Sequence, residues 1–196
     1  NVTVEVPSGT LTIRKNGSSR IEPHALISQS ESRAVRWNDQ RRAMLVSALG
    51  DGKPLAIPLQ EKAVAATHAD RLAILVARSK DKLHVFDINT GQLLHTLQGF
   101  LTINEFVIDE QHSRLFVATD RPEVQAFDLR TGAELPMLLG NEGPVKSLAL
   151  SRDNRTLLTG GSDGITRSFD TATGQLRSAH YGHKGSVLRV TFAEND

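Results

Sequence analysis

Short apolar stretches alternate with clusters of polar residues, glycine and proline along most of the chain. The clearest example covers residues 145–178, where apolar stretches lie at residues 145–150, 156–159, 165–169 and 175–178. The turns between them hold Asp153 with Asn154, Asp163 with Gly164, and Thr173 with Gly174. Asp, Asn and Gly tolerate turn conformations that β-branched residues resist. The pattern therefore predicts four consecutive antiparallel strands.

The same pattern recurs at a nearly constant period. A Phe-Asp pair appears at almost equal intervals, as Phe86 with Asp87, Phe127 with Asp128, and Phe169 with Asp170. A Thr-Gly pair begins three residues after each of these Asp residues. Four strands in each period of about 42 residues are typical of a propeller blade. We therefore expect an all-β protein, a β-propeller of four-stranded antiparallel blades that form a partial, open ring.

The period also predicts the boundaries of the repeats. We expect blades at residues 64–100, 101–140 and 141–182, and the first strand of a truncated blade, over 187–192, within residues 183–196. Residues 1–24 are interpreted as an N-terminal β-hairpin or partial blade. The chain as a whole is expected to be cut from a longer protein.

Residues 25–63 are interpreted as a degenerate blade. The apolar stretch 43–48 is similar to a second strand, but it lies too close to the matching Leu72 for a full period, so about one strand and one turn are expected to be missing. Gly50, Asp51 and Gly52 would form its hairpin. Pro54 and Pro58 would place the strand after it at a sheet edge or a bulge, because proline cannot donate to a ladder.

Residues 157–170 and 182–187 resemble the WD-repeat (WD40) family. The family pattern has Gly-His before the first strand, Ser or Thr in the second strand, Asp in the next hairpin, and Trp-Asp at the end of the third strand. The matching residues here are Thr159, Asp163, Phe169 and Asp170, with His183 after Gly182 and Asn141 at the position of the His in the blade before. The resemblance implies a hydrogen-bonded group that stiffens each blade, since buried polar atoms need partners.

The chain departs from this pattern in two ways. Phe86, Phe127 and Phe169 replace the tryptophan and lack its indole donor, and Val76 and Val117 stand at the Ser/Thr position. The blades are therefore expected to depend on aliphatic packing. Residues 114–134 also resemble the surface-layer type of propeller, so the subfamily stays open.

Three features are candidate sites of chemistry. His180 and His183 are three residues apart, but they lie in a strand-to-loop segment, where this spacing does not aim both rings at one metal ion. The glycine-rich residues 160–164 precede neither a Lys-Ser/Thr pair nor a helix, so a hairpin is favoured over a phosphate loop. The Asp residues of the Phe-Asp pairs recur in every blade, which favours a structural role in the turn. No catalytic residue, cofactor or metal is expected.

Composition narrows the function classes further. Lys and Arg number 23 against 22 Asp and Glu, so the net charge of +1 does not favour nucleic acid as a partner. The absence of cysteine excludes disulfides and thiol chemistry. The apolar stretches are far shorter than the roughly 20 residues of a spanning helix. We expect a soluble protein and favour the cytoplasm, and Trp37 is expected in the core, at the end of the first strand of the degenerate blade.

The resemblance implies a scaffold that binds other proteins through loops at one face. On this chain that face comprises Lys80, Asp81, Arg121, Pro122, Asn141, Asp163 and Lys184, with Phe100 and Leu101 as apolar anchors. The alternative is a sensor or regulatory domain of a larger enzyme, or a surface-layer-type propeller that binds a small ligand. Unpaired strand edges, such as that of residues 187–192, also predict self-association.

Overall fold

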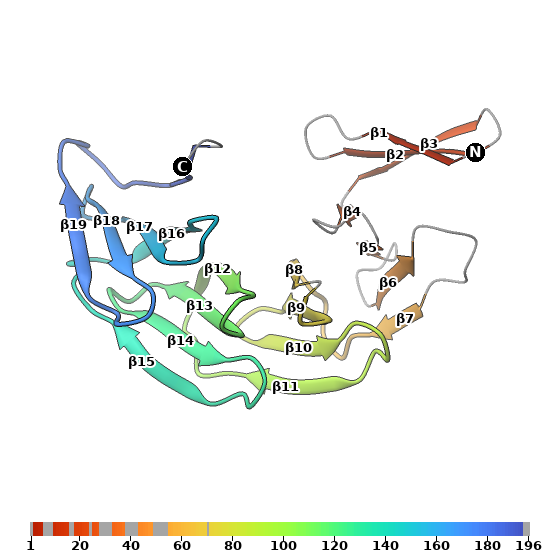
Figure 1. Cartoon of the computed structure of the whole chain (residues 1–196), viewed down its shortest axis with the longest axis horizontal. Coiled ribbons are helices and arrows are strands. Elements are labelled where there is room, and N and C mark those ends of the chain that lie inside the picture. The colour runs from red at the N-terminus through yellow and green to blue at the C-terminus, as the bar shows by residue number, and fades with distance from the viewer. Residues whose placement is uncertain are drawn as a thin grey trace. The chain divides into compact units, whose positions relative to one another are not determined.

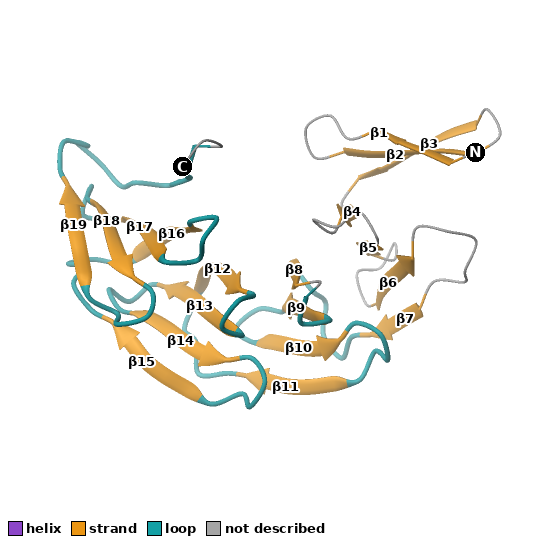
Figure 2. Cartoon of the chain, viewed as in Figure 1, coloured by secondary structure: helices purple, strands orange, loops and turns teal. Residues whose placement is uncertain are grey.

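The computed structural model describes residues 2–5, 10–15, 18–23, 25–27, 33–37, 43–48, 55–69 and 71–193. Before residue 55 it describes side chains only at residues 35 and 43–46, and the side chain of residue 68 is also left out. The described residues form strands and loops (Figure 2). They divide into two compact units, one of residues 1–79 and 86–94, the other of residues 80–85 and 95–196.

Two complete four-stranded antiparallel sheets lie in the second unit (Figure 1). The first has the order β12 (Ile103–Asp109), β13 (Arg114–Thr119), β14 (Val124–Asp128) and β15 (Glu134–Leu138). The second has the order β16 (Val145–Leu150), β17 (Thr156–Gly161), β18 (Thr166–Asp170) and β19 (Leu176–His180). Both are four-stranded meanders of the kind predicted for propeller blades, and we call them blade 2 and blade 3.

Blade 1 consists of β8 (Ala65–Ala69), β9 (Ile74–Arg78), β10 (Leu83–Asp87) and β11 (Leu93–Leu97). These strands also pair in sequence order, with β8 and β11 at the two edges. The predicted segments 64–100, 101–140 and 141–182 therefore each contain one four-stranded sheet. The all-β propeller fold class inferred from the repeat is confirmed.

The segment interpreted as a degenerate blade contains a complete sheet, so the prediction of a missing strand was wrong. Its strands are β4 (Ala25–Ile27), β5 (Arg33–Trp37), β6 (Ala43–Ala48) and β7 (Leu55–Pro58), paired in that order. The apolar stretch 43–48 is the third strand, not the second, and it precedes β10 by roughly one repeat period. The second and third strands of a blade are both apolar, which made the misassignment possible, and the three-residue β4 gave little signal. Pro58 does lie in an edge strand, as predicted.

The N-terminal segment, interpreted as a hairpin or partial blade, forms a three-stranded sheet. β1 (Val2–Glu5) pairs antiparallel with β2 (Thr10–Lys15), and β3 (Ser18–Pro23) adds a third strand to the sheet. The sheet contains a hairpin of β1 and β2, and its third strand is compatible with the alternative of a partial blade. The expected hairpin at residues 50–52 and Pro54 lie outside the described residues.

Residues 187–192 do not form the predicted strand. A strand is defined by ladder pairing with a neighbour, and among the described residues none pairs with this segment in a ladder. The segment nevertheless contacts blade 3: Val187 N donates to Gly161 O over 2.9 Å, and Val190 N donates to Ser147 Oγ over 3.1 Å.

The donors of these two bonds correspond to two donors by which β16 contacts blade 2. Val145 N donates to Arg121 O over 3.2 Å, and Leu148 N donates to Glu105 Oε2 over 3.0 Å. Each donor in residues 187–190 follows its counterpart in β16 by one repeat period. Residues 187–190 therefore lie against blade 3 as the inner strand β16 lies against blade 2, without the ladder of a strand.

Buried apolar side chains fill the space between blade 2 and blade 3. Phe116, Val124, Val145, Leu157 and Phe169 belong to this core cluster. In the other unit, Phe86 packs in a cluster that contains residues of β7 and β9. The phenylalanines at the tryptophan position are thus buried apolar groups, each of which contributes on the order of 2 kcal/mol by burial.

The Phe-Asp and Thr-Gly pairs form one repeated turn. In blade 2, Asp128 Oδ1 accepts hydrogen bonds from the N–H groups of Arg130 and Thr131, at 2.9 and 2.8 Å. Gly132 N donates to Asp128 O, and Gly132 has a φ of 73°. Asp87 and Asp170 accept the equivalent pairs of bonds in their own turns. These bonds are of the kind that the predicted structural role of the Asp residues requires.

Candidate interaction surface

The loops that carry the predicted partner-binding residues lie at one end of the blades. In an antiparallel meander, the connection between the second and third strands and the connection to the next blade leave the sheet at the same end. In the second unit these loops are residues 98–102, 120–123, 139–144, 162–165 and 181–186, together with Lys80 and Asp81 between β9 and β10. We call this end the loop face.

Hydrogen bonds connect neighbouring loops of this face. Asn141 Nδ2 donates to Pro122 O over 3.0 Å, which joins the loop entering blade 3 to a hairpin of blade 2. Thr159 Oγ1 donates to Asn141 Oδ1 over 2.7 Å, so the amide of Asn141 also bonds within its own blade. Ser162 N donates to Pro144 O over 2.9 Å. Backbone groups paired in this way hold the loops in one arrangement.

A buried arginine stabilises the loop face of blade 3. Arg167 on β18 is 2% exposed, and its Nη1 lies 2.6 Å from Asp163 Oδ2. Asp163 also accepts from Ile165 N and Glu142 N. Partial burial raises the pKa of Asp163, but the bonds from Arg167 and the two amides outweigh it, so the net shift is downward. Glu142 is exposed and its Oε1 lies 3.7 Å from Arg167 Nη2.

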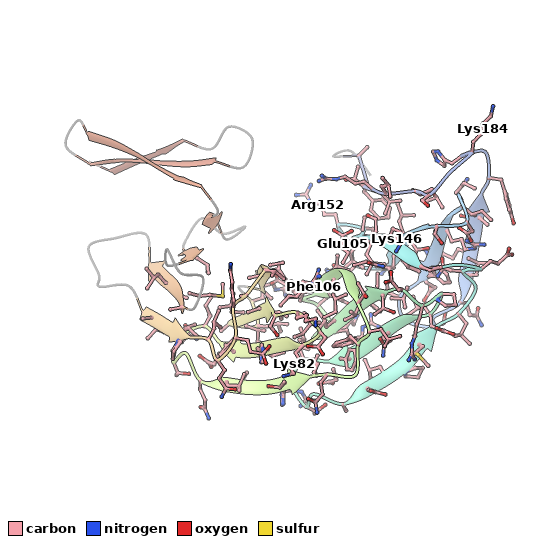
Figure 3. All side chains as sticks on the ribbon, turned by 180° about the vertical axis from the view of Figure 1, so that it is seen from behind. Lys82, Glu105, Phe106, Lys146, Arg152 and Lys184 are labelled. Carbon is pink, nitrogen blue, oxygen red and sulfur yellow. The ribbon has the colours of Figure 1, made fainter. Side chains whose placement is uncertain are left out.

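A second ion pair joins the two blades near the inner strands. Lys146 Nζ on β16 lies 2.7 Å from Asp120 Oδ1 in the hairpin of blade 2. Asn104 Nδ2 on β12 donates to the same oxygen and to Val145 O. The bond from Lys146, followed by that from Asn104, lowers the pKa of Asp120. Figure 3 shows Lys146 beside Glu105 on these inner strands.

Four of the residues predicted to contact partners are exposed. They are Lys80, Leu101, Arg121 and Lys184, and Leu101 is 74% exposed. Lys184 extends away from the loop after β19 (Figure 3). Asp81 and Pro122 are half-buried.

Two predicted contact residues are buried instead. Phe100, expected to be an apolar anchor, is 5% exposed, and its ring packs edge-on against Phe127 with centroids 5.7 Å apart. Asn141 is 8% exposed and its amide is used by Thr159 and Pro122. Both predictions of an accessible side chain were wrong, because each residue contacts other parts of the blades that sequence spacing alone does not place.

The structure describes the side chains of the two histidines but not that of the tryptophan. His180 Nε2 lies 3.2 Å from Ser178 Oγ. His183 is exposed, and within the described part of the chain its side chain forms no hydrogen bond of the expected scaffold type. The side chain of Trp37 lies outside the described residues.

One buried polar cluster was missed by the repeat analysis. The carboxylate of Asp109 is fully buried, and Arg114 Nη2 lies 2.6 Å from its Oδ2. His112 Nδ1 lies 2.9 Å from the same oxygen, and the N–H groups of Gln111 and His112 donate to Oδ1. Arg114 also donates to Thr171 O of blade 3. The available signal was that Asp109 and Arg114 replace Ser151 and Thr156 of the next repeat.

This cluster is saturated by its own hydrogen bonds. Every bond to Asp109 comes from its own turn or from Arg114, and the carboxylate has no exposed surface. A buried carboxylate with an arginine partner is a common structural ion pair. The arrangement joins blade 2 to blade 3 at the end opposite the loop face.

Within the residues that the structure describes, there is no helix with the length and apolar character required to cross a membrane.

No family model matches the chain. Among curated proteins, Autophagy-related protein 16 of Arabidopsis thaliana is 28% identical over 173 residues, which are 87% of this chain and 32% of that protein. The DENN domain and WD repeat-containing protein SCD1 of Arabidopsis thaliana is 24% identical over 165 residues, which are 82% of this chain and 13% of that protein. The chain therefore spans about a third or less of the length of these relatives.

Among solved structures, the computationally designed Ika8 protein is similar with a TM-score of 0.72 and 21% sequence identity. The similarity covers 99% of this chain and 66% of that protein. At this level of identity the likeness concerns the fold.

Proposed function

We propose that this WD-repeat β-propeller chain is a non-catalytic scaffold that holds partner proteins through its loop face. The observation that carries the proposal is the contrast between a fixed frame and exposed side chains at that face. Asn141 and Pro122 connect the loops of neighbouring blades, while Leu101, Arg121 and Lys184 are exposed. Rigid scaffolds that present variable loops are a common way to build a binding site.

The exposed residues also have suitable chemistry for protein contact. An arginine and a large apolar side chain are typical of the few anchors that dominate the affinity of an interface. Arg121 and Leu101 offer these two chemistries on loops of one blade. Because they differ from the residues at the same positions of blade 3, Asp163 and Glu142, the face would recognise its partner through features that break the repeat.

The alternative of an enzyme domain requires ionisable groups that converge on solvent without partners. Two carboxylates at the inner strands and loops are paired instead: Asp120 with Lys146, and Asp163 with Arg167. Asp109 is likewise paired with Arg114. These pairs favour structural roles over general acid or base chemistry.

The proposal is tested by affinity capture with a triple variant of the loop face, Leu101→Ser, Arg121→Ala and Lys184→Ala. Proteins retained specifically by the wild-type chain should be lost with this variant. The matched control is Arg130→Ala with Arg152→Ala, two exposed arginines in hairpins at the opposite end. Equal loss with the control, or no loss with the triple variant, would contradict binding at the loop face.

Catalysis is tested separately with hydrolase and oxidoreductase substrate panels on the purified chain. Turnover that disappears with Asp120→Asn or Glu105→Gln would contradict the non-catalytic proposal. These two carboxylates are chosen because Glu105 lies on β12, the inner strand of blade 2, and Asp120 accepts a hydrogen bond from Asn104 on the same strand.

Self-association through open sheet edges remains part of the proposal. β19 lies at the edge of its sheet, and edge strands present unpaired backbone groups to other chains. Size-exclusion chromatography over a range of concentrations should show the chain eluting as oligomers. A monomer at all concentrations would contradict this expectation.

A further inference from the structure

Charges of opposite sign alternate along the loop face of the second unit. Arg121, Glu142 and Lys184 are exposed, and they lie on three different loops of that face. We propose that this order of charges selects the partner: the loop face binds an extended peptide segment of a partner protein in which a lysine or arginine lies between two acidic residues. Such a partner presupposes the scaffold role proposed above, since it occupies the same face.

Hydrogen bonds place the loop of Arg121 beside the loop of Glu142. Asn141 Nδ2 donates to Pro122 O over 3.0 Å, and Val145 N donates to Arg121 O over 3.2 Å. Both donors belong to the segment that enters blade 3, and both acceptors belong to the β13–β14 hairpin of blade 2. The segment that carries Glu142 therefore lies against the hairpin that carries Arg121.

The β17–β18 hairpin of blade 3 connects the loop of Glu142 to the loop of Lys184. Glu142 N donates to Asp163 Oδ2 of this hairpin over 3.3 Å. A Cβ placed on Gly164 of the same hairpin would lie 2.8 Å from His183 O, so the next loop also lies against it. Lys184 follows His183 directly. The three exposed charges therefore succeed one another across the face in the order in which they occur along the chain.

The central charge of this row is negative. Arg167 is 2% exposed, and its Nη1 lies 2.6 Å from Asp163 Oδ2 while its Nη2 lies 3.7 Å from Glu142 Oε1. One buried cation thus faces two carboxylates, which leaves a net negative charge. The side chain of Glu142 is 76% exposed, so this negative charge faces solvent.

The two flanking charges are positive and accessible. Among the residues that the structure describes, neither Arg121 nor Lys184 forms an ion pair. Asp120, the neighbour of Arg121, is paired with Lys146 at 2.7 Å. Lys184 extends away from its loop (Figure 3). Charge complementarity therefore favours acidic residues of the partner opposite the two cations and a basic residue opposite Glu142.

Equivalent positions of successive repeats carry opposite charges on this face. Glu142 and Lys184 each stand two residues after a glycine with a positive φ, 134° in one loop and 133° in the next. Arg121 likewise stands at the position of Asp163. A side chain that the blade itself requires should recur from blade to blade, as the Asp of the Phe-Asp pairs does. Charges that reverse at matching positions are instead suited to recognition.

The test begins with random linear peptides displayed on phage and selected against the immobilised 196-residue chain. Enriched peptides should carry a lysine or arginine with an acidic residue on either side. One of them, labelled for fluorescence anisotropy, is measured against wild type and against the exchange variant, Glu142→Lys with Lys184→Glu. This variant keeps the net charge of the chain and changes only the order of charges, so we expect the Kd to rise by about tenfold or more.

Reciprocal rescue separates charge order from damage to the face. In two further peptides the basic residue changes places with one or the other acidic neighbour, and one of them should bind the exchange variant more tightly than wild type. The matched control exchanges two exposed charges at the opposite end, Arg152→Glu with Glu134→Arg, and should leave the Kd unchanged. Lys184→Glu alone, which should also raise the Kd, is the fallback if the exchange variant loses its native circular dichroism spectrum.

Contrary outcomes distinguish the choice of partner from the scaffold role. A selection that enriches no peptide, or peptides without the charge order, would overturn this choice of partner and leave the capture experiment above to decide the scaffold role. A Kd unaffected by the exchange but raised by Leu101→Ser, Arg121→Ala and Lys184→Ala would do the same. Peptide binding that survives both sets of changes would contradict binding at the loop face altogether.

Discussion

Asn141 Nδ2 lies 3.0 Å from the backbone oxygen of Pro122, so one side chain joins the loop that enters blade 3 to a hairpin of blade 2. The same amide accepts a hydrogen bond from Thr159 Oγ1, at 2.7 Å, inside blade 3. Phe100 stands at the position of Asn141 in the loop that enters blade 2. Val76 of blade 1 and Val117 of blade 2 stand at the position of Thr159. Blade 3 therefore has a polar connection where the other blades have apolar packing.

Asn141→Ala should destabilise the chain by about 1–3 kcal/mol, because it leaves the buried hydroxyl of Thr159 without its partner. Thr159→Val should cost a similar amount by leaving Asn141 Oδ1 unpaired. The double variant should cost less than the sum, since no buried polar group is then left without its mate. Urea denaturation of the four proteins measures this coupling, and strict additivity would contradict it.

Gly132→Ala should destabilise the chain more than Gly174→Ala. Both glycines have a positive φ, 73° and 71°, where an alanine costs on the order of 1–2 kcal/mol. A Cβ on Gly132 would also lie 2.9 Å from His95 Cγ, so the ring must move and its hydrogen bond to Arg130 O is lost. A Cβ on Gly174 would meet its nearest atom, Leu138 Cγ, at 4.0 Å.

The difference between these two variants isolates the contact with His95. Thermal unfolding should give a lower Tm for Gly132→Ala than for Gly174→Ala. The further change His95→Ala should recover part of the loss in the Gly132→Ala background and none in the Gly174→Ala background. Equal melting temperatures for the two glycine variants would show that only φ matters.

Asp163→Ala should be more destabilising than Arg167→Gln. Removing Asp163 leaves the guanidinium of Arg167 buried beside only the distant carboxylate of Glu142, and an unpaired buried charge costs about 3 kcal/mol or more. Arg167→Gln installs the residue that blade 2 has at this position, Gln125, and leaves Asp163 with its two amide donors. Chemical denaturation ranks the two, and the reverse order would contradict the role of Asp163 as the counter-ion.

Acid should destabilise the protein through its structural carboxylates. The pKa of Asp170 is lowered, first by its bond from Arg177 and then by the N–H of Thr173, and the pKa of Asp128 is lowered chiefly by the N–H of Thr131. A carboxyl whose folded pKa is below its unfolded value stabilises the fold fully above the unfolded pKa, about 4. That stability is lost as the pH falls below about 4 towards the folded pKa.

Arg177→Met provides the specific check of this acid effect. It removes the largest cause of the lowered pKa of Asp170, so the carboxyl should titrate closer to its ordinary value in an NMR titration. The variant should also lose less stability than wild type between neutral and acidic pH. An unchanged titration of Asp170 would contradict the assignment of Arg177 as the main cause.

The sequence predicted best those features that depend on neighbouring residues. The Asp and Thr-Gly turns, with Asp128 and Gly132 as the example, need only a few consecutive residues to form their hydrogen bonds and positive φ. The order of strands in blades 1 to 3 follows from these turns. The sequence was less informative at residues 33–48, where two apolar strands of one blade are alike and only the pairing of β4 to β7 assigns their places.

By itself the sequence determined the period, the turns and the all-β architecture, because these arise from local backbone preferences repeated at a constant spacing. Only the tertiary structure decided which side chains are accessible. Phe100 and Asn141 are buried by contacts with Phe127 and Pro122, whereas Leu176 of blade 3 reaches Gly140 at the end of blade 2. Burial depends on residues distant in the chain, and their positions follow from how the blades pack together.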